Sequence, residues 1–219
     1  MFSGKKRQTA EKAEQKADHG MILKTLDYCY EKAVSGMPGF ETAEQIARHY
    51  MDDASSPDSR VQKLIRSQIA KAATSGFVTG LGGILTLPIA VPANISSVLY
   101  VQIRMIAALA FLAGYDLRDE KVKPLVYVCL CGNDAKMVIN QIGIQAGTNI
   151  SAQTLFEVSG ANITKINRAV SLYLMRKLGQ TGAASLGKAV PLIGGIIGGT
   201  VDSISTKNIG AAATKIFVC

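Results

Sequence analysis

The spacing of apolar positions predicts helices along nearly the whole chain. Between about residues 9 and 35, apolar side chains recur at three- and four-residue intervals, and Gly36-Met37-Pro38-Gly39 then predicts a break. Further helices are expected at about 42–51, 119–131, 134–147, 161–178 and 209–217. Runs of alternating polarity, which would mark strands, are absent from the sequence. The chain is therefore predicted to be all-α and to fold as a single compact helical bundle.

A basic amphipathic helix is predicted to begin near Asp58, with Pro57 as an early helical residue. Its apolar side carries Val61, Leu64, Ile65, Ile69 and Ala72. Its other positions include Arg60, Lys63, Arg66 and Lys71, with no acidic residue among them. Such a helix most commonly packs its apolar stripe on the protein's own core. The alternative is a helix that lies in a membrane interface.

A long uncharged tract follows this helix. From Ala72 to Ile103 the sequence has 32 residues without a charged side chain. A ~30 Å hydrocarbon core needs only about 20 apolar residues to be spanned. However, Pro88 and Pro92 should divide the tract into two shorter helices, the second running through Arg104 to about Ala113. We expect a helical hairpin that is either buried in the protein or re-entrant in a bilayer.

A weaker version of this pattern lies near the C-terminus, between Lys188 and Asp202. Gly194-Gly195-Ile196-Ile197 there resembles Gly82-Gly83-Ile84-Leu85 of the first tract. The predicted bundle thus contains two Gly-rich apolar hairpin segments. Glycines at three- and four-residue spacing allow helices to approach closely. Because each costs about 1 kcal/mol relative to Ala in a helix, close packing or conformational change must compensate.

The charge of the chain is unevenly distributed. The formal net charge is +8, but the residues before Arg60 contain eight basic and ten acidic side chains, for a net charge of −2. The rest of the chain contains sixteen basic and six acidic side chains, for a net charge of +10. A basic, apolar region favours anionic lipid headgroups as a partner; a solvated basic surface is the alternative. No nucleic-acid motif occurs, and an aromatic content of 6% without Trp argues against base stacking.

No catalytic or metal-binding pattern is present, so we predict no enzymatic activity and no cofactor. The two histidines, His19 and His49, lack Cys, Asp or His at metal-ligand spacing, and a surface role is expected for both. The cysteines Cys29, Cys129, Cys131 and Cys219 are expected to be mainly buried, reduced thiols. The N-terminal residues do not have the apolar stretch of a secretory signal peptide, which predicts a cytoplasmic protein.

Four polar residues stand in strongly apolar sequence: Asn94, Gln102, Arg104 and Asp202. A polar group buried without a partner costs several kcal/mol, so these side chains are expected to be paired. Our first interpretation is a structural hydrogen-bond network that joins the two Gly-rich tracts. The alternative is a polar anchor for a lipid headgroup, with Arg104 as the phosphate partner.

Several of these segments together resemble the signature of the EcsC family. The resemblance is carried by 76–83, Leu87-Pro88, Val91-Pro92-Ala93, Gln102-Ile103-Arg104, Gly114-Tyr115-Asp116, 190–199 and 205–210. It spans about residues 22–217. Asn94 and Asp202 depart from the family pattern, in which an acid and an Asn, respectively, are more usual. The resemblance implies a helical fold and peripheral membrane association, and it supplies no catalytic residues. The family takes its name from a bacterial gene linked to an ABC-type transporter, which makes a membrane transporter component a possible partner.

The sequence therefore predicts a helical domain over 21–219, preceded over 1–20 by a basic N-terminal tail and the start of the first helix. This domain is expected to work at the cytoplasmic face of an anionic membrane, as an accessory to a transport or envelope process. A soluble carrier of lipid or another apolar ligand, and a membrane-perforating effector, are the alternatives. The predicted membrane or lipid contacts are Phe77, Leu81, Ile84, Leu85, Leu87, Pro88, Ile193, Ile196 and Ile197. The predicted headgroup or polar anchors are Lys63, Arg66, Arg104, Arg168, Lys188, Asn94 and Asp202.

Overall fold

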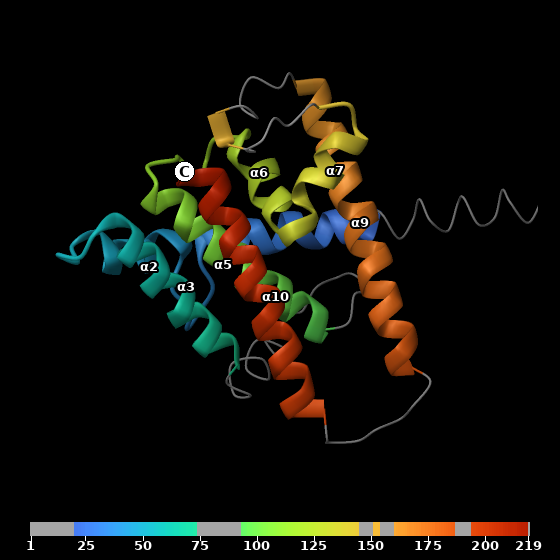
Figure 1. Cartoon of the computed structure of the whole chain (residues 1–219), viewed down its shortest axis with the longest axis horizontal. Coiled ribbons are helices and arrows are strands. Elements are labelled where there is room, and N and C mark those ends of the chain that lie inside the picture. Colours follow the sequence, from blue (N-terminus) through green and yellow to red (C-terminus); the bar gives the residue numbers. More distant parts are fainter. Residues whose placement is uncertain (1–19, 74–92, 145–150, 154–159, 187–193, 219) are drawn as a thin grey trace, which may run out of the picture.

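The chain folds as an all-α protein, as predicted. The computed structural model describes residues 20–73, 93–144, 151–153, 160–186 and 194–218, and these contain helices and no strand (Figure 1). In order, the elements are a helix over residues 20–35, α2 (Ala43–Met51), α3 (Pro57–Ala73), α5 (Ala93–Leu112), α6 (Val122–Cys129), the 3-10 helix η1 (Gly132–Asp134), α7 (Ala135–Gln141), α9 (Gly160–Leu186) and α10 (Gly194–Phe217).

Helix α5 forms the centre of the bundle. It contacts α2, α3, α6 and α10, while α9 packs on α6 and α7 at the other side of the molecule (Figure 1). Every residue from Leu99 to Ala110 is buried, so α5 is enclosed on all sides by the other helices. A helix that is apolar around its whole circumference has this central place in a soluble bundle as well as in a membrane.

Local signals explain where the early helices begin and end. The helix over residues 20–35 ends at Gly36, whose φ of 93° lies in the left-handed region that glycine adopts without a Cβ penalty. Thr42 caps α2. Its hydroxyl accepts a hydrogen bond from the backbone N–H of Gln45, and the side-chain oxygen of Gln45 accepts one from the backbone N–H of Thr42. Pro57 is the first residue of α3, as expected for a residue that lacks an N–H donor.

The helix boundaries of the second half differ from the prediction. Helix α10 begins at Gly194 and not near residue 209, so the glycines from Gly194 to Gly199 are helical. Their helix penalty of about 1 kcal/mol each had favoured a break there. Helix α9 likewise continues to Leu186, whereas α7 ends at Gln141, just before Gly143, whose φ is 79°.

The helix termini that precede and follow the two Gly-rich tracts in the sequence lie at one end of the bundle. In Figure 1, α3 and α9 finish at the lower end, where α5 and α10 begin. We call this the charge-poor end, defined by the termini Ala73, Ala93, Leu186 and Gly194. Helices α5 and α10 finish at the opposite, upper end. We call that the charged end, because residues 113–123 follow α5 there and six of these eleven residues are charged.

Candidate functional site

The charge-poor end brings together helix termini that are far apart in the sequence. Residues 72–95 and 178–201 lie on either side of its four helix termini, and Lys188 is the one charged residue in those 48 positions. The rest of the neutral tract, 96–103, lies inside the bundle and is largely buried. The lack of charge over 96–103 is therefore explained by an ordinary core.

Most of the predicted membrane-contact residues lie outside the part that the structure describes. These are Phe77, Leu81, Ile84, Leu85, Leu87, Pro88 and Ile193, and the predicted anchor Lys188 lies outside it too. Ile196, Ile197 and Asp202 belong to α10, and Asn94 belongs to the first turn of α5. For these four the helix is described and the side chain is not. The predicted contacts at these positions remain predictions.

The basic helix α3 packs its apolar stripe on the core, which confirms the first of the two interpretations. Val61, Leu64 and Ile65 are buried there. On its outer side Lys63 Nζ lies 2.7 Å from Asp53 Oδ2, and the hydrogen bond from Lys63 lowers the pKa of that carboxyl group. Arg66 is exposed, about two turns before α3 ends.

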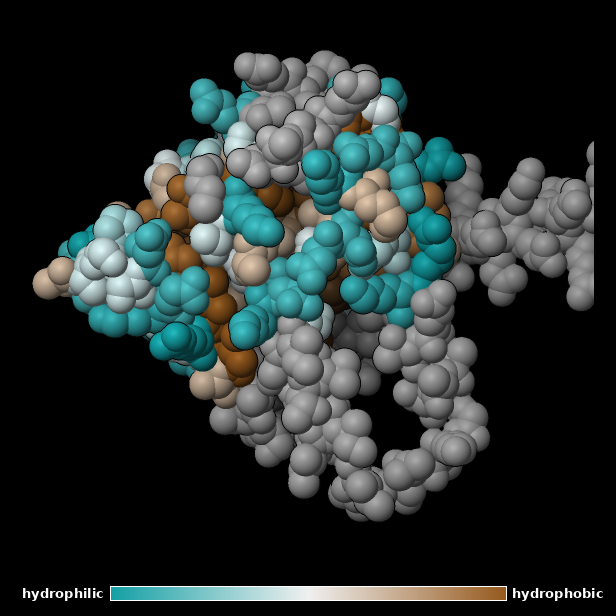
Figure 2. Space-filling view, viewed as in Figure 1, coloured by the Kyte–Doolittle hydropathy of each residue, from teal (hydrophilic) through white to brown (hydrophobic). Residues whose placement is uncertain are grey.

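The second basic helix, α9, presents its cations elsewhere. Its exposed basic residues are Lys165, Arg168, Arg176 and Lys177. Figure 1 shows α3 and α9 on opposite sides of α10. The two basic helices therefore do not merge into one continuous patch. In Figure 2, hydrophilic surface covers much of this face, and a hydrophobic strip descends between the α2–α3 pair and α10.

A buried polar cluster surrounds Arg104, which is 2% exposed. Its Nη1 donates to the Glu41 backbone oxygen at 3.3 Å, and its Nη2 donates to Gln68 Oε1 at 3.5 Å. The guanidinium carbon lies 5.3 Å from the Tyr100 ring centroid and 6.0 Å from that of Phe40, within cation–π range. Burial lowers the pKa of Arg104 and raises that of Tyr100.

The surroundings of Glu41 add further charge to this cluster. Its carboxylate lies 2.6 Å from His49 Nε2 and 3.3 Å from Lys71 Nζ. The hydrogen bond with His49 is the main cause of the lowered pKa of Glu41. His49 is exposed, as predicted. The sequence could have pointed to Gln68, which follows Leu64 by four residues and so lies on the apolar side of α3.

One buried polar contact joins α5 to α10, the two helices that follow the Gly-rich tracts, while the predicted network itself remains a prediction because the Asn94 and Asp202 side chains lie outside the description. Gln102 Nε2 of α5 donates to Thr206 Oγ1 of α10 at 3.3 Å, and both side chains are buried. Arg104 is bonded to Gln68 of α3 and to Glu41 in the segment before α2. A buried polar pair of this kind fixes how two apolar helices lie against each other.

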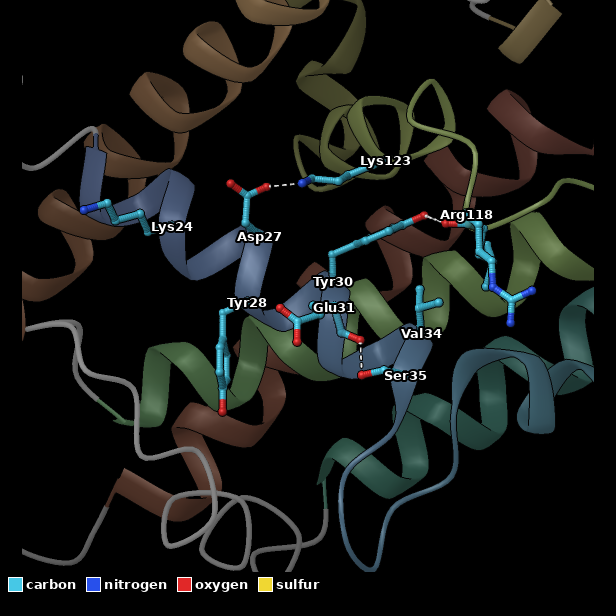
Figure 3. Close-up of a pocket in the computed structure, with 10 residues that line it drawn as sticks. Lys24, Asp27, Tyr28, Tyr30, Glu31, Val34, Ser35, Arg118 and Lys123 are labelled. Carbon is cyan, nitrogen blue, oxygen red and sulfur yellow. Dashed lines mark hydrogen bonds and ion pairs between the residues drawn. The ribbon is translucent and has the colours of Figure 1, made fainter.

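An open pocket of about 670 Å³ lies between the helix over residues 20–35 and residues 117–123 (Figure 3). At one side Asp27 Oδ1 lies 2.6 Å from Lys123 Nζ and accepts from the Tyr127 hydroxyl at 2.8 Å. At the other side the Tyr30 hydroxyl donates to the Leu117 carbonyl at 2.7 Å. Burial is the main cause of the raised pKa of both tyrosines. These bonds tie the first helix to the charged end.

The described cysteines are free and buried, as predicted. They are Cys29, Cys129 and Cys131, and burial raises the pKa of Cys29 and of Cys131 to about 12. A thiol with such a pKa stays protonated and unreactive at neutral pH. Within the described residues, no group of three or more His, Cys, Asp or Glu side chains is placed to hold a metal ion.

A search of the described helices for a membrane span found none with both the length and the apolar character to cross a bilayer.

Comparison with known proteins gives one match. No curated protein and no solved structure matches the chain. The model of the EcsC protein family matches residues 2–218, which is nearly the whole length. Together with the helical fold and the signature segments around α5 and α10, this match shows that the chain belongs to the EcsC protein family.

Proposed function

We propose that this protein attaches peripherally to an anionic membrane by its charge-poor end. The observation that carries the proposal is the convergence of four helix termini, flanked by 48 residues with a single charge, at one end of the bundle. The surface of a soluble domain commonly has about 25–35% charged residues. Apolar side chains in these flanking residues would be more stable in contact with acyl chains than in contact with water.

Electrostatic attraction would add to this apolar contact. The chain from Arg60 onward has a net charge of +10, and exposed cations such as Arg66 and Lys177 stand on the two helices that run toward this end. Each cation near an anionic leaflet contributes about 1 kcal/mol. A hydrophobic strip beside α3 runs down toward the same end (Figure 2).

The proposed side of the membrane is the cytoplasmic one. Buried thiols that remain free fit a reducing compartment, and Cys29, Cys129 and Cys131 are all of this kind.

An accessory role beside a membrane transporter is a further part of the proposal, and it is supported by family resemblance alone. The carrier and perforating alternatives are outcomes of the experiment below, since no described contact favours either.

Flotation of the full chain with lipid vesicles tests the attachment. We expect the protein to float with vesicles that contain phosphatidylserine or phosphatidylglycerol, and to float less with pure phosphatidylcholine. Arg66→Glu should weaken binding about tenfold or more, since it exchanges an attraction for a repulsion of about 1 kcal/mol each. The control is Arg118→Glu, the same charge change on an exposed arginine at the charged end.

The outcomes separate the three candidate functions. Failure to float with anionic vesicles at 150 mM salt would refute the proposal. Equal weakening by Arg66→Glu and Arg118→Glu would refute the assignment of the charge-poor end. Release of an entrapped dye would favour perforation, and a lipid retained by the purified protein in native mass spectrometry would favour a carrier.

A further inference from the structure

The pocket beside the first helix is an open groove whose acidic side chains are already paired. It lies between the first helix and the segment after α5, and its volume is about 670 Å³ (Figure 3). The carboxylate of Asp27 is paired with Lys123, whose Nζ lies 2.6 Å from Oδ1. The carboxylate of Glu31 is paired with Lys32 at 3.2 Å. Both negative charges of the groove are therefore compensated by cations of the protein itself.

Two cations of the groove, in contrast, have no partner among the described residues. They are the Lys24 ammonium on the first helix and the Arg118 guanidinium on the segment after α5. Both side chains are exposed, and Figure 3 shows the half-buried Tyr28 between them. Its hydroxyl can donate, and it too has no hydrogen bond within the described part of the chain. The charge that remains uncompensated is positive, so charge complementarity favours an acidic occupant.

The shape of the groove favours an extended chain. The groove follows one face of the first helix from Lys24 to Ser35, eleven positions or about 16 Å along the axis. An extended chain of about five residues covers that length at about 3.3 Å per residue. A small-molecule pocket usually encloses most of its ligand, whereas this groove lies open at the surface.

The lining is also unsuited to an amphipathic helix. Such a helix places an apolar face in a hydrophobic groove. Here Val34 and Leu117 supply the aliphatic surface, and charged or hydroxyl-bearing side chains make up the rest of the lining.

The wall opposite the first helix is held in place by the protein's own hydrogen bonds. The Tyr30 hydroxyl donates to the Leu117 carbonyl at 2.7 Å. The backbone N–H of Arg118 donates to Asp116 Oδ1 at 2.9 Å. These bonds fix the backbone on which the Arg118 side chain stands. A surface that is ordered in advance loses less conformational entropy when a partner binds.

We propose that this groove binds an extended acidic segment of a partner protein. Acidic side chains about five residues apart would pair with Lys24 and Arg118, and the Tyr28 hydroxyl would donate to a backbone carbonyl between them. An apolar side chain next to one of the acids would contact Val34 and Leu117. The groove adjoins the charged end, so this interaction does not depend on the proposed membrane attachment. Failure of one would leave the other intact.

Selection from a display library of random peptides, with the full chain as bait, tests the chemistry of the occupant. We expect enriched peptides to carry two acidic residues about five positions apart, as the length of the groove requires. Their affinity, measured by fluorescence anisotropy, should fall as the salt concentration rises. Enrichment of apolar residues at three- and four-residue spacing would identify a docked helix and overturn the proposal. Enrichment without acidic residues would overturn it as well.

Charge reversal tests whether the enriched peptide lies in the groove. Arg118→Glu and Lys24→Glu should each weaken binding about fivefold or more, because an exposed ion pair is replaced by a repulsion. A peptide with lysine in place of the matching acid should regain affinity for the reversed variant, which a loss of folding would not allow. Lys136→Glu, on an exposed lysine of α7 outside the groove, is the matched control and should leave the affinity unchanged. The proposal is overturned if Arg118→Glu weakens binding no more than Lys136→Glu does.

Discussion

The two ends of the bundle differ in the charge of the sequence that adjoins their helix termini. At the charged end, six of the eleven residues at 113–123 carry charge, and named contacts hold the segment in place, among them Tyr30 to Leu117 and Lys123 to Asp27. At the charge-poor end, Lys188 is the one charge in 48 flanking residues. The charged end therefore carries side chains that water solvates well. The second has a composition that a nonaqueous surface would satisfy better.

The comparison predicts, first, that the core near the charged end is complete without any partner. Leu109, in the last turn of α5, is 0% exposed. Leu109→Ala should lower the free energy of unfolding by about 2–5 kcal/mol, because it removes buried methyl groups and leaves a cavity. Chemical denaturation followed by circular dichroism measures this loss.

The control for this change is an apolar side chain that the structure leaves outside. Met137 is 47% exposed, and Met137→Ala should change the free energy of unfolding by less than about 0.5 kcal/mol. If Leu109→Ala proved equally neutral, this end would lack the close-packed core that we assign to it.

The second prediction concerns the contact between α10 and α3. A Cβ on Gly210 would lie 3.0 Å from Ile65 Cγ2 and 3.2 Å from both Cγ1 and Cδ1. Ile65 is β-branched and 5% exposed, so it has little room to move away. Gly210→Ala should therefore lower the free energy of unfolding by about 1 kcal/mol, since overpacking outweighs the better helix propensity of Ala.

A second substitution should reverse that sign. In an Ile65→Ala background the obstructing atoms are gone, and Gly210→Ala should then stabilise by up to about 1 kcal/mol through helix propensity. The double-mutant cycle, measured by urea denaturation, gives the coupling directly. A destabilisation of the same size in both backgrounds would mean that the two helices do not approach closely at Gly210.

Local signals explain which parts of the fold could be predicted from sequence. Gly36, the Thr42–Gln45 pair and Pro57 each act on the backbone within a few residues, and the helices end or begin where these residues predict. Pro92 likewise immediately precedes α5. In α10 the local signal gives the wrong boundary, because glycines that weaken an isolated helix are part of this helix. At Gly210 the reason is visible: a side chain there would contact Ile65 of α3 too closely.

The candidate site could be predicted only in part, because its contacts link distant residues. A buried Arg104 and a buried Gln102 follow from polar residues in an apolar sequence. Their partners do not: Gln68 precedes Arg104 by 36 residues, and Thr206 follows Gln102 by 104. That the helix termini bounding the two charge-poor segments share one end is also a property of the three-dimensional path. Sequence spacing alone contains no information on which helix termini share an end.

The third prediction concerns the pocket of the charged end, where the expected loss is also far below that of Leu109→Ala. The Tyr30 hydroxyl donates to the Leu117 carbonyl at 2.7 Å, and both residues are buried (Figure 3). Tyr30→Phe keeps the edge-to-face ring contact with Tyr127, 6.2 Å between centroids, and removes only the hydrogen bond. The loss should be about 0.5–1.5 kcal/mol in the free energy of unfolding.

The neighbouring Tyr28 provides the comparison within the same pocket. The structure gives its hydroxyl no hydrogen bond among the described residues, and its ring, 5.5 Å from Lys32 Nζ, is unaffected by removal of the oxygen. Tyr28→Phe should therefore be neutral in urea denaturation, and both variants should float with anionic vesicles as the wild type does. If Tyr30→Phe weakened flotation, membrane contact would extend to the charged end, and the proposed division of roles between the two ends would be wrong.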